Sequence, residues 1–266
     1  MQFHHQTPFG YGYTPLVLRN AGTADMLMEF GVLRVQSDEH YEHYSETDER
    51  VWLLSQGKAR ICLGKEGWYE ISRPNTFDYA PWCFSVPAKV KITISVSEGV
   101  AEFYYVATNN PRRFDIKIYP PEVCHSEFRG EGTMRETSTR IVRTIFDDTN
   151  HPKSNLVIGE VIGVPGKWSS YPPHHHPQPE IYHYRFLPEQ GFGLTAIGNT
   201  PYIIRDKDTI LIRDGEDHPQ VTAPGYAMWY LWVIRHLENQ RYGPQYVAEA
   251  HQWVSGPEDH IWQPKR

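Results

Sequence analysis

The sequence predicts an all-β protein made of two β-barrels. Short runs of β-branched and aromatic residues recur along the chain, and Gly, Pro, Asn and Asp stand between them. Almost no stretch repeats apolar residues at helical spacing, and strands at this spacing are typical of sandwiches and barrels. A length of 266 residues with 39% hydrophobic residues is sufficient to build such cores.

The predicted strands fall into two groups. Asn109, Pro111 and the segment Gly130–Gly132 interrupt the pattern between them. We therefore place the domain boundary between residues 109 and 140, with a first barrel at residues 1–115 and a second at residues 116–266. The first group of strands comprises residues 30–35, 51–55, 59–63, 84–86, 90–96 and 101–107, and the second comprises residues 141–146, 155–164, 181–186, 194–197, 202–205, 209–213 and 226–234.

Histidines and a glutamate with metal-ligand spacing stand in the second half. His174, His176 and Glu180 form an HxHxxxE pattern, and His218 follows in the turn Gly215–Pro219. Two histidines one residue apart on an extended segment project to the same side, and imidazoles with one carboxylate suit zinc, manganese, iron or nickel. The pattern predicts one divalent metal per chain, zinc or manganese first. A solvated histidine-rich loop is the alternative, because several prolines surround the motif.

The first half carries a weaker set of the same residue types. His40, His43 and Glu49 precede a predicted strand, but their spacing is imperfect and no histidine stands near residues 84–87. We expect these three residues at the surface and a first barrel that binds no metal.

Strand alternation indicates which residues surround the metal. If Glu180 points into the barrel, Tyr182 and Tyr184 share its face, whereas His183 and Arg185 point outward. Tyr182 and Tyr184 are therefore candidates to line the pocket, either as barrel-filling aromatics or as groups that contact a substrate.

The ligand pattern resembles the two motifs of the cupin superfamily. The HxHxxxE core and the Gly215-x-x-His218 spacing match, whereas Trp168, Leu187 and Thr222 stand where those motifs prefer glycine or asparagine. The resemblance implies a bicupin, a fold of two jelly-roll β-barrels.

Four blocks around the motif, at residues 168–174, 181–186, 188–193 and 223–226, carry a narrower resemblance. They resemble the 5-deoxy-glucuronate isomerases of inositol catabolism, which are grouped with a pectin-pathway uronate isomerase in the KduI/IolB-type bicupin family. Weaker similarity at residues 53–59 and 128–132 extends this over most of the chain. Residues 232–236, Trp-Val-Ile-Arg-His, depart from the Asn, small hydrophobic pair and Ala-Gly that the family usually shows.

The resemblance implies a metal-dependent aldose–ketose isomerase that converts 5-deoxy-glucuronate to 2-deoxy-5-keto-gluconate. A divalent ion polarises the carbonyl, and proton transfer through an enediol moves the carbonyl from C1 to C2. Tyr182, Tyr184 and Glu189 are candidates for the catalytic proton transfer, and Arg140 or Arg185 for binding the substrate carboxylate. A pectin-derived deoxy uronate is the alternative substrate. A cupin dioxygenase and a non-enzymatic sugar-binding cupin are alternatives of other classes.

The composition favours an intracellular protein that acts on small molecules. A net charge of −6 disfavours general nucleic-acid binding. Three cysteines without CxxC spacing argue against a disulfide framework. The N-terminal residues lack the features of a secretory signal, and the longest apolar stretch, residues 227–234, is too short to span a membrane. We expect a cytoplasmic homo-oligomer whose partner is a small anionic sugar acid, not nucleic acid or membrane.

Overall fold

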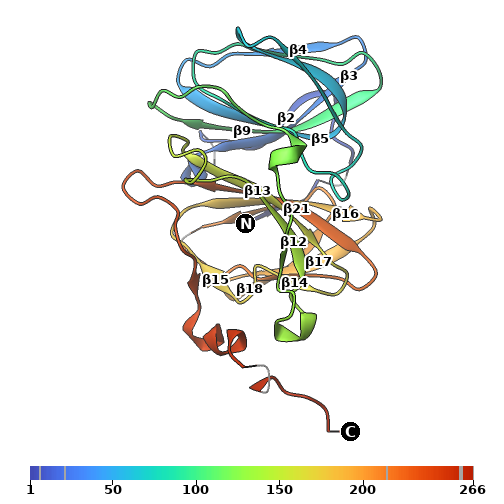
Figure 1. Cartoon of the computed structure of the whole chain (residues 1–266), viewed down its shortest axis with the longest axis vertical. Coiled ribbons are helices and arrows are strands. Elements are labelled where there is room, and N and C mark those ends of the chain that lie inside the picture. The colour runs from blue at the N-terminus through green and yellow to red at the C-terminus, as the bar shows by residue number, and fades with distance from the viewer. Residues whose placement is uncertain (6, 21, 214, 258–259, 266) are drawn as a thin grey trace. The chain divides into compact units, whose positions relative to one another are not determined.

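The computed structural model describes residues 1–5, 7–20, 22–213, 215–257 and 260–265. Strands dominate these ranges, so the predicted all-β class is confirmed. The chain forms two compact units (Figure 1). Unit 1 comprises Met1–Gln6, Ser126–Arg143 and Gly159–Arg266, and unit 2 comprises Thr7–His125 and Thr144–Ile158. The chain passes from unit 2 to unit 1 at residues 125–126, which lie within the predicted boundary region. The other points at which the chain passes between the units have no counterpart in the sequence prediction.

Unit 2 contains, within the described residues, a nine-stranded sheet in the order β10-β7-β5-β9-β3-β2, with β4, β6 and β8 paired off this path. Antiparallel pairing connects all of these strands. The elements are β2 (Gly12–Val17), η1 (Ala24–Met26), β3 (Glu29–Gln36), β4 (His40–His43), β5 (Asp48–Leu63), β6 (Trp68–Arg73), β7 (Cys83–Val86), β8 (Ile92–Ser95), β9 (Val100–Asn109), β10 (Lys117–Tyr119) and η2 (Pro121–Val123).

The two strands predicted at residues 51–55 and 59–63 form one strand, the 16-residue β5. Its pairing with β9 shifts register between Leu54 and Gln56, which marks a β-bulge. Gly57 follows with φ +106°, and a Cβ there would lie 2.3 Å from the carbonyl oxygen of Val100. Only glycine fits this close approach. The residues between the two predicted strands therefore belong to one continuous strand.

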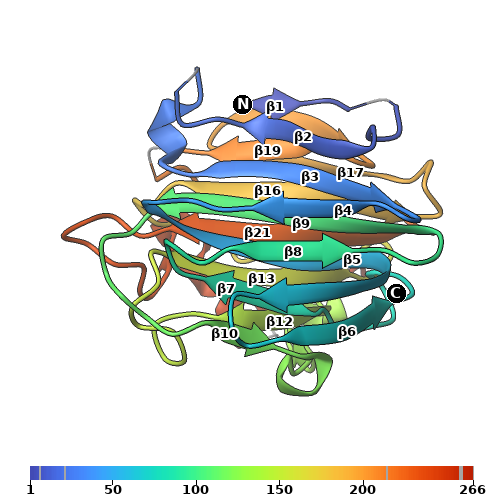
Figure 2. The same ribbon diagram turned by 90° about the horizontal axis from the view of Figure 1, so that it is seen from above.

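Three further sheets of the described residues lie mainly in unit 1, and residues 144–146 and 156–158 of the largest one belong to unit 2. A seven-stranded sheet has the order β1-β19-β16-β21-β13-β12-β11, and the labels β1, β19, β16, β21, β13 and β12 follow this order from top to bottom in Figure 2. A four-stranded sheet has the order β14-β20-β17-β18, and β15 pairs with β22. The elements are β1 (Gln2–Phe3), β11 (Glu127–Arg129), η3 (Met134–Glu136), β12 (Arg140–Phe146), β13 (Leu156–Gly163), β14 (Trp168–Ser169), β15 (His174–His175), β16 (Glu180–Leu187), β17 (Phe192–Ile197), β18 (Thr200–Arg205), β19 (Thr209–Ile212), β20 (Gln220–Thr222), β21 (Ala227–Arg235), β22 (Tyr246–Val247) and η4 (Glu249–Ser255).

The core of unit 1 lies between its two larger sheets. Tyr182 and Tyr184 from β16 pack in one buried cluster with Ile197 from β17 and Ile204 from β18. Side chains two residues apart on a strand share a face, so the alternation predicted for β16 directs these tyrosines inward. In the described residues, no helix is long and apolar enough to cross a membrane.

Candidate metal centre

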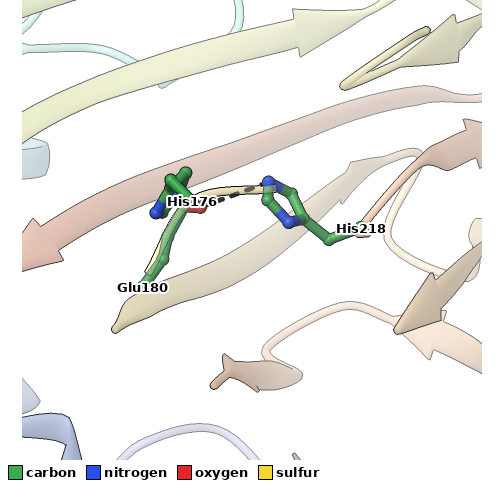
Figure 3. Close-up of side chains that lie close together, drawn as sticks. All are labelled: His176, Glu180 and His218. Atoms are coloured by element: carbon green, nitrogen blue, oxygen red, sulfur yellow. Dashed lines mark hydrogen bonds and ion pairs between the residues drawn. The ribbon is translucent and has the colours of Figure 1, made fainter. Parts of the chain in front are cut away.

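Three of the four predicted ligands meet in a buried group in unit 1 (Figure 3). His176, Glu180 and His218 each place one ligand atom within 4.8 Å of the others. Nε2 of His176 lies 3.1 Å from Oε2 of Glu180, and Nε2 of His218 lies 3.5 Å from the same oxygen. At most 3% of each residue is exposed. The two histidines and the carboxylate therefore lie together in one buried position.

The spacing of these atoms fits ligands of one divalent ion. Two atoms that each lie about 2.1 Å from an ion are about 3.0 Å apart at a right angle and about 3.4 Å apart in a tetrahedron. The distances of 3.1 and 3.5 Å are close to these values. Nε2 of His218 is buried and makes no hydrogen bond within the described part of the chain. A bound ion would satisfy this atom.

Backbone carbonyls orient two of the histidine rings. Nδ1 of His218 donates to the carbonyl of Glu216 at 2.9 Å, and Nδ1 of His174 donates to the carbonyl of Pro172 at 2.8 Å. These bonds assign the proton to Nδ1 and leave the Nε2 lone pair available. Metal-binding histidines show this arrangement, in which the second ring nitrogen is held by a hydrogen bond.

His174, the fourth predicted ligand, lies beside the group and outside the 4.8 Å set. Its ring centroid is 4.9 Å from that of His218. Burial lowers the pKa of His174 to about 4 and also lowers the pKa of His218. Both rings are therefore neutral near pH 7, the form that binds a metal. The role of His174 as a ligand stays a prediction.

The lowered histidine pKa values predict that the metal-free protein loses stability as the pH falls from about 6.5 to 4. In this interval the unfolded chain binds a proton at His174 that the folded chain does not, because the folded pKa is about 4 and the ordinary value is 6.5. We expect the Tm of chelator-treated protein to fall by roughly 5 °C. His174→Gln should show a shallower fall, and an identical pH profile for both proteins would contradict the assignment.

Hydroxyl groups line the barrel next to the His176–Glu180–His218 group. The hydroxyl of Tyr182 lies 3.0 Å from Oγ of Ser170, and its ring lies 5.9 Å from that of His218. The hydroxyl of Tyr230 lies 2.5 Å from Oγ of Ser169, and its ring lies 4.9 Å from that of Tyr182. Burial raises the pKa of both tyrosines, so both hydroxyls stay protonated at neutral pH.

Tyr184 lies further along the same face of β16. Its ring is 6.1 Å from that of Tyr182 and 5.8 Å from that of Tyr230. It is fully buried and packs with Phe186 in the apolar cluster of unit 1. This position favours Tyr182 over Tyr184 as the residue that reaches a ligand beside the histidines.

Of the two arginines predicted to bind a carboxylate, Arg140 faces the interior of unit 1. It lies two residues before Val142 on β12 and therefore shares the strand face of Val142, which belongs to the buried cluster. Its charge interacts with Tyr230 and Tyr182, and burial lowers the pKa of its guanidinium. Nη1 donates to the backbone carbonyl and to Oγ of Ser138 at 2.8 and 2.9 Å. No carboxylate of the described residues forms an ion pair with Arg140, so its charge is available to an anionic ligand.

Arg185 and Glu189, which were also predicted as site residues, do not lie in the group and have partners elsewhere. Nε of Arg185 donates to Oδ1 of Asp206 at 3.1 Å, on the face of β16 opposite Glu180. Glu189 follows the far end of β16, which is roughly 23 Å from Glu180 at about 3.3 Å per residue. Its exposed carboxylate pairs with Lys207. Glu189 lines a separate pocket of about 360 Å³. Glu189 is close to Glu180 in sequence, but the extended strand between the two residues keeps their side chains far apart.

The three first-half residues that were predicted to lie at the surface differ in burial. His40 is exposed. Glu49 is fully buried, where its carboxylate accepts a hydrogen bond from Oγ of Ser154 at 2.6 Å. His43 is partly buried, and the hydroxyl of Tyr105 lies 3.3 Å from its Nε2. The surface prediction is therefore wrong for Glu49 and His43, because both side chains have polar partners within unit 2.

Comparison with solved structures places the chain in a known fold class. An IolB-like protein from Salmonella typhimurium LT2 matches with a TM-score of 0.84 at 22% identity, covering 96% of this chain and 99% of that one. A cupin 2 conserved barrel domain protein from Leptotrichia buccalis matches with a TM-score of 0.50 at 14% identity, covering 86% and 91%. The chain therefore has the fold of cupin-type proteins, and this fold holds the buried histidine–carboxylate group.

Comparison of sequences identifies the family. The model of the KduI/IolB family matches residues 6–254, and the chain belongs to this family. A relative from Geobacillus kaustophilus, named 5-deoxy-glucuronate isomerase, is 27% identical over 207 residues, which cover 71% of this chain and 72% of the relative. Several other relatives carry the same name. The chain is therefore an enzyme of the aldose–ketose isomerase class, as the sequence predicted.

Proposed function

We propose that this enzyme is a metal-dependent isomerase that converts 5-deoxy-glucuronate to 2-deoxy-5-keto-gluconate. The observation that carries the proposal is the partly buried guanidinium of Arg140, which has no carboxylate partner in the described residues and faces the same barrel interior as the ligand group. A uronate presents a carboxylate to the arginine and a carbonyl to the metal position. The name of the relatives supports this substrate. With it, the enzyme would act in myo-inositol catabolism in the cytoplasm.

The residues of the group fit a divalent cofactor. His176, Glu180 and His218, with His174 as a fourth ligand, would hold one zinc or manganese ion, and iron or nickel suits the same donors. When bound, the ion supplies a Lewis acid that polarises the substrate carbonyl. The burial of the ligands excludes water from this position, which strengthens electrostatic interactions inside the barrel.

Arg140 and Tyr182 perform the remaining tasks. The guanidinium binds the distal carboxylate and fixes the orientation of the sugar chain. The protonated hydroxyl of Tyr182 gives its proton to the carbonyl oxygen as the enediol forms and recovers one from the neighbouring hydroxyl as the ketone forms. Ser170, at 3.0 Å, hydrogen-bonds with the Tyr182 hydroxyl and orients it. Isomerisation needs such a proton transfer between the two carbons and their oxygens. Tyr230 hydrogen-bonds with Ser169 beside this pair and holds the polar wall in place.

A further unpaired group supports a polar ligand in this interior. Gln220 stands two residues after His218, is fully buried, and donates from Nε2 to Oγ of Ser170 at 3.4 Å. Its Oε1 has no hydrogen-bond partner within the described residues. A buried amide oxygen without a donor is unfavourable, and a substrate hydroxyl would satisfy it.

Replacing Tyr182 by phenylalanine should lower kcat by roughly 100-fold, because general acid–base groups contribute about this much. We expect little change in KM, since the ring and its packing remain. Tyr184→Phe is the matched control and should retain most of the activity. Steady-state kinetics on 5-deoxy-glucuronate measure both variants. An unchanged kcat in Tyr182→Phe would remove this residue from the proton transfer.

Metal analysis and a substrate comparison test the proposal as a whole. The purified protein should contain close to one divalent ion per chain and should isomerise 5-deoxy-glucuronate faster than the pectin-derived deoxy uronate. A preference for the second uronate would change the substrate and keep the class. Oxygen consumption with either compound would instead indicate a cupin dioxygenase.

A further inference from the structure

Unit 2 repeats the strand pairing that positions Glu180 in unit 1. Glu180 begins β16 opposite Ile212, the last residue of β19, and the pairing runs over four residues. Arg50, near the start of β5, lies opposite Val86, the last residue of β7, and this pairing also runs over four residues. β5 and β16 pair on their other sides with the long strands β9 and β21. Arg50 therefore holds in unit 2 the place that Glu180 holds in unit 1.

Arg50 is a fully buried cation without a carboxylate partner in the described residues. Its Nη2 donates to the carbonyls of Pro87 and Val90 at 2.7 and 2.8 Å, and its Nη1 donates to Nδ1 of His43 at 3.3 Å. These neutral acceptors satisfy hydrogen bonds but do not balance the charge, and Asp48, the carboxylate whose charge interacts with Arg50, is itself paired with Arg19. Burial of an uncompensated charge is costly, so an anion beside Arg50 would stabilise the unit.

Three buried donors near Arg50 lack acceptors within the described part of the chain. They are Nε of Arg50, Nε1 of Trp52 and the hydroxyl of Tyr13. The guanidinium lies 5.6 Å from the Trp52 ring, and the Tyr105 ring connects Trp52 at 5.1 Å to Tyr13 at 5.3 Å. An arginine or tryptophan N–H can only donate. The cluster therefore lacks a hydrogen-bond acceptor. Because Arg50 is positively charged, an acceptor with a negative charge is favoured.

We propose that unit 2 binds a small organic carboxylate at the Arg50 cluster. The cluster consists of Tyr13, Tyr41, His43, Arg50, Trp52 and Tyr105. Tyr13, Tyr41 and His43 are partly exposed and form its outer side, whereas Arg50 and Trp52 are fully buried. The site needs no metal, because the guanidinium supplies the positive charge at the position where unit 1 places a ligand.

The chemistry of the cluster selects the class of ligand. A carboxylate has two acceptor oxygens in a plane, which suits a guanidinium and neighbouring N–H donors. The aromatic rings offer apolar faces to a short carbon chain. His43 adds no charge near pH 7, because burial lowers its pKa to about 4. One guanidinium therefore matches a monoanion. A purely structural role for Arg50 would explain its bonds to two carbonyls but leaves the three donors unpaired.

The test follows the indole N–H of Trp52 in full-length protein labelled with ¹⁵N-tryptophan. Trp52→Phe identifies its signal, and gluconate is the probe. We expect gluconate to shift this signal saturably, also in His218→Ala, which separates the effect from the unit 1 site. Tyr13→Phe should weaken the binding roughly tenfold, as loss of one hydrogen bond to a charged ligand predicts. Tyr119→Phe, which removes another buried unpaired hydroxyl of unit 2, should leave it unchanged.

Three results would overturn the proposal. The first is a Trp52 signal that gluconate does not move at millimolar concentration. The second is a shift that sodium chloride reproduces at the same concentration, which would indicate a simple ion site. The third is equal affinity in Tyr13→Phe and the unmodified protein. None of these readouts depends on turnover. They therefore test carboxylate binding to unit 2 independently of the result of the isomerase assay.

Discussion

Replacing His218 by alanine should release the bound metal and lower kcat at least roughly 1000-fold while the protein stays folded. Nε2 of His218 lies 3.5 Å from the Glu180 carboxylate and makes no hydrogen bond in the described residues, so its loss removes a ligand atom. Metal content by mass spectrometry, circular dichroism and turnover measure the three quantities. His174→Ala and His176→Ala should behave in the same way.

His175→Ala is the matched control for these variants. It lies between two of the predicted ligands, but its Nδ1 contacts Oδ1 of Asp217 at 2.8 Å and its side chain is partly exposed. This variant should keep its metal and its activity. Nearly stoichiometric metal in any of the three ligand variants would remove that histidine from the proposed set.

Replacing Arg140 by glutamine should reduce kcat/KM by roughly 1000-fold, mainly through a higher KM. Truncating one partner of a buried charged pair costs about 2–5 kcal/mol, which covers this factor. The effect requires that the guanidinium, which lacks a carboxylate partner in the described residues, binds the carboxylate of the substrate. Initial-rate kinetics on 5-deoxy-glucuronate measure it.

Arg185→Gln tests the same residue type on the opposite face of the sheet. Arg185 pairs with Asp206, so its loss should leave KM nearly unchanged. If Arg185→Gln raised KM and Arg140→Gln did not, the carboxylate would bind elsewhere. Equal metal content in both variants is expected, because neither residue belongs to the ligand group.

The candidate ligands could be predicted because three of them lie on one short extended segment. His174, His176 and Glu180 are close in sequence; the structure brings His176 and Glu180 into one group, and His174 lies beside it. Tyr230 was missed because only the register of β16 and β21, which pairs it with Tyr184, shows its position. Such pairing between distant strands leaves no local signal in the sequence.

The long strands could be predicted from apolar runs, whereas short polar strands could not. β6 alternates exposed and buried residues, and its exposed positions Glu70 and Ser72 conceal the pattern. β1 pairs with β19, so its existence depends on residues about 200 positions away. Arg50 illustrates the same limit, since a charged residue at the start of an apolar run suggests a strand end and instead is fully buried. Self-association and cytoplasmic location stay predictions of the sequence.

Isomerisation of 5-deoxy-glucuronate in deuterated water tests the central proposal most directly. The metal-loaded protein should form the ketose without consuming oxygen or nicotinamide, and nuclear magnetic resonance should find deuterium at the former aldehyde carbon. The chelated protein should be inactive until the metal returns. Complete retention of the substrate hydrogen would contradict proton transfer through an enediol, and oxygen uptake with carbon–carbon cleavage would contradict the isomerase itself.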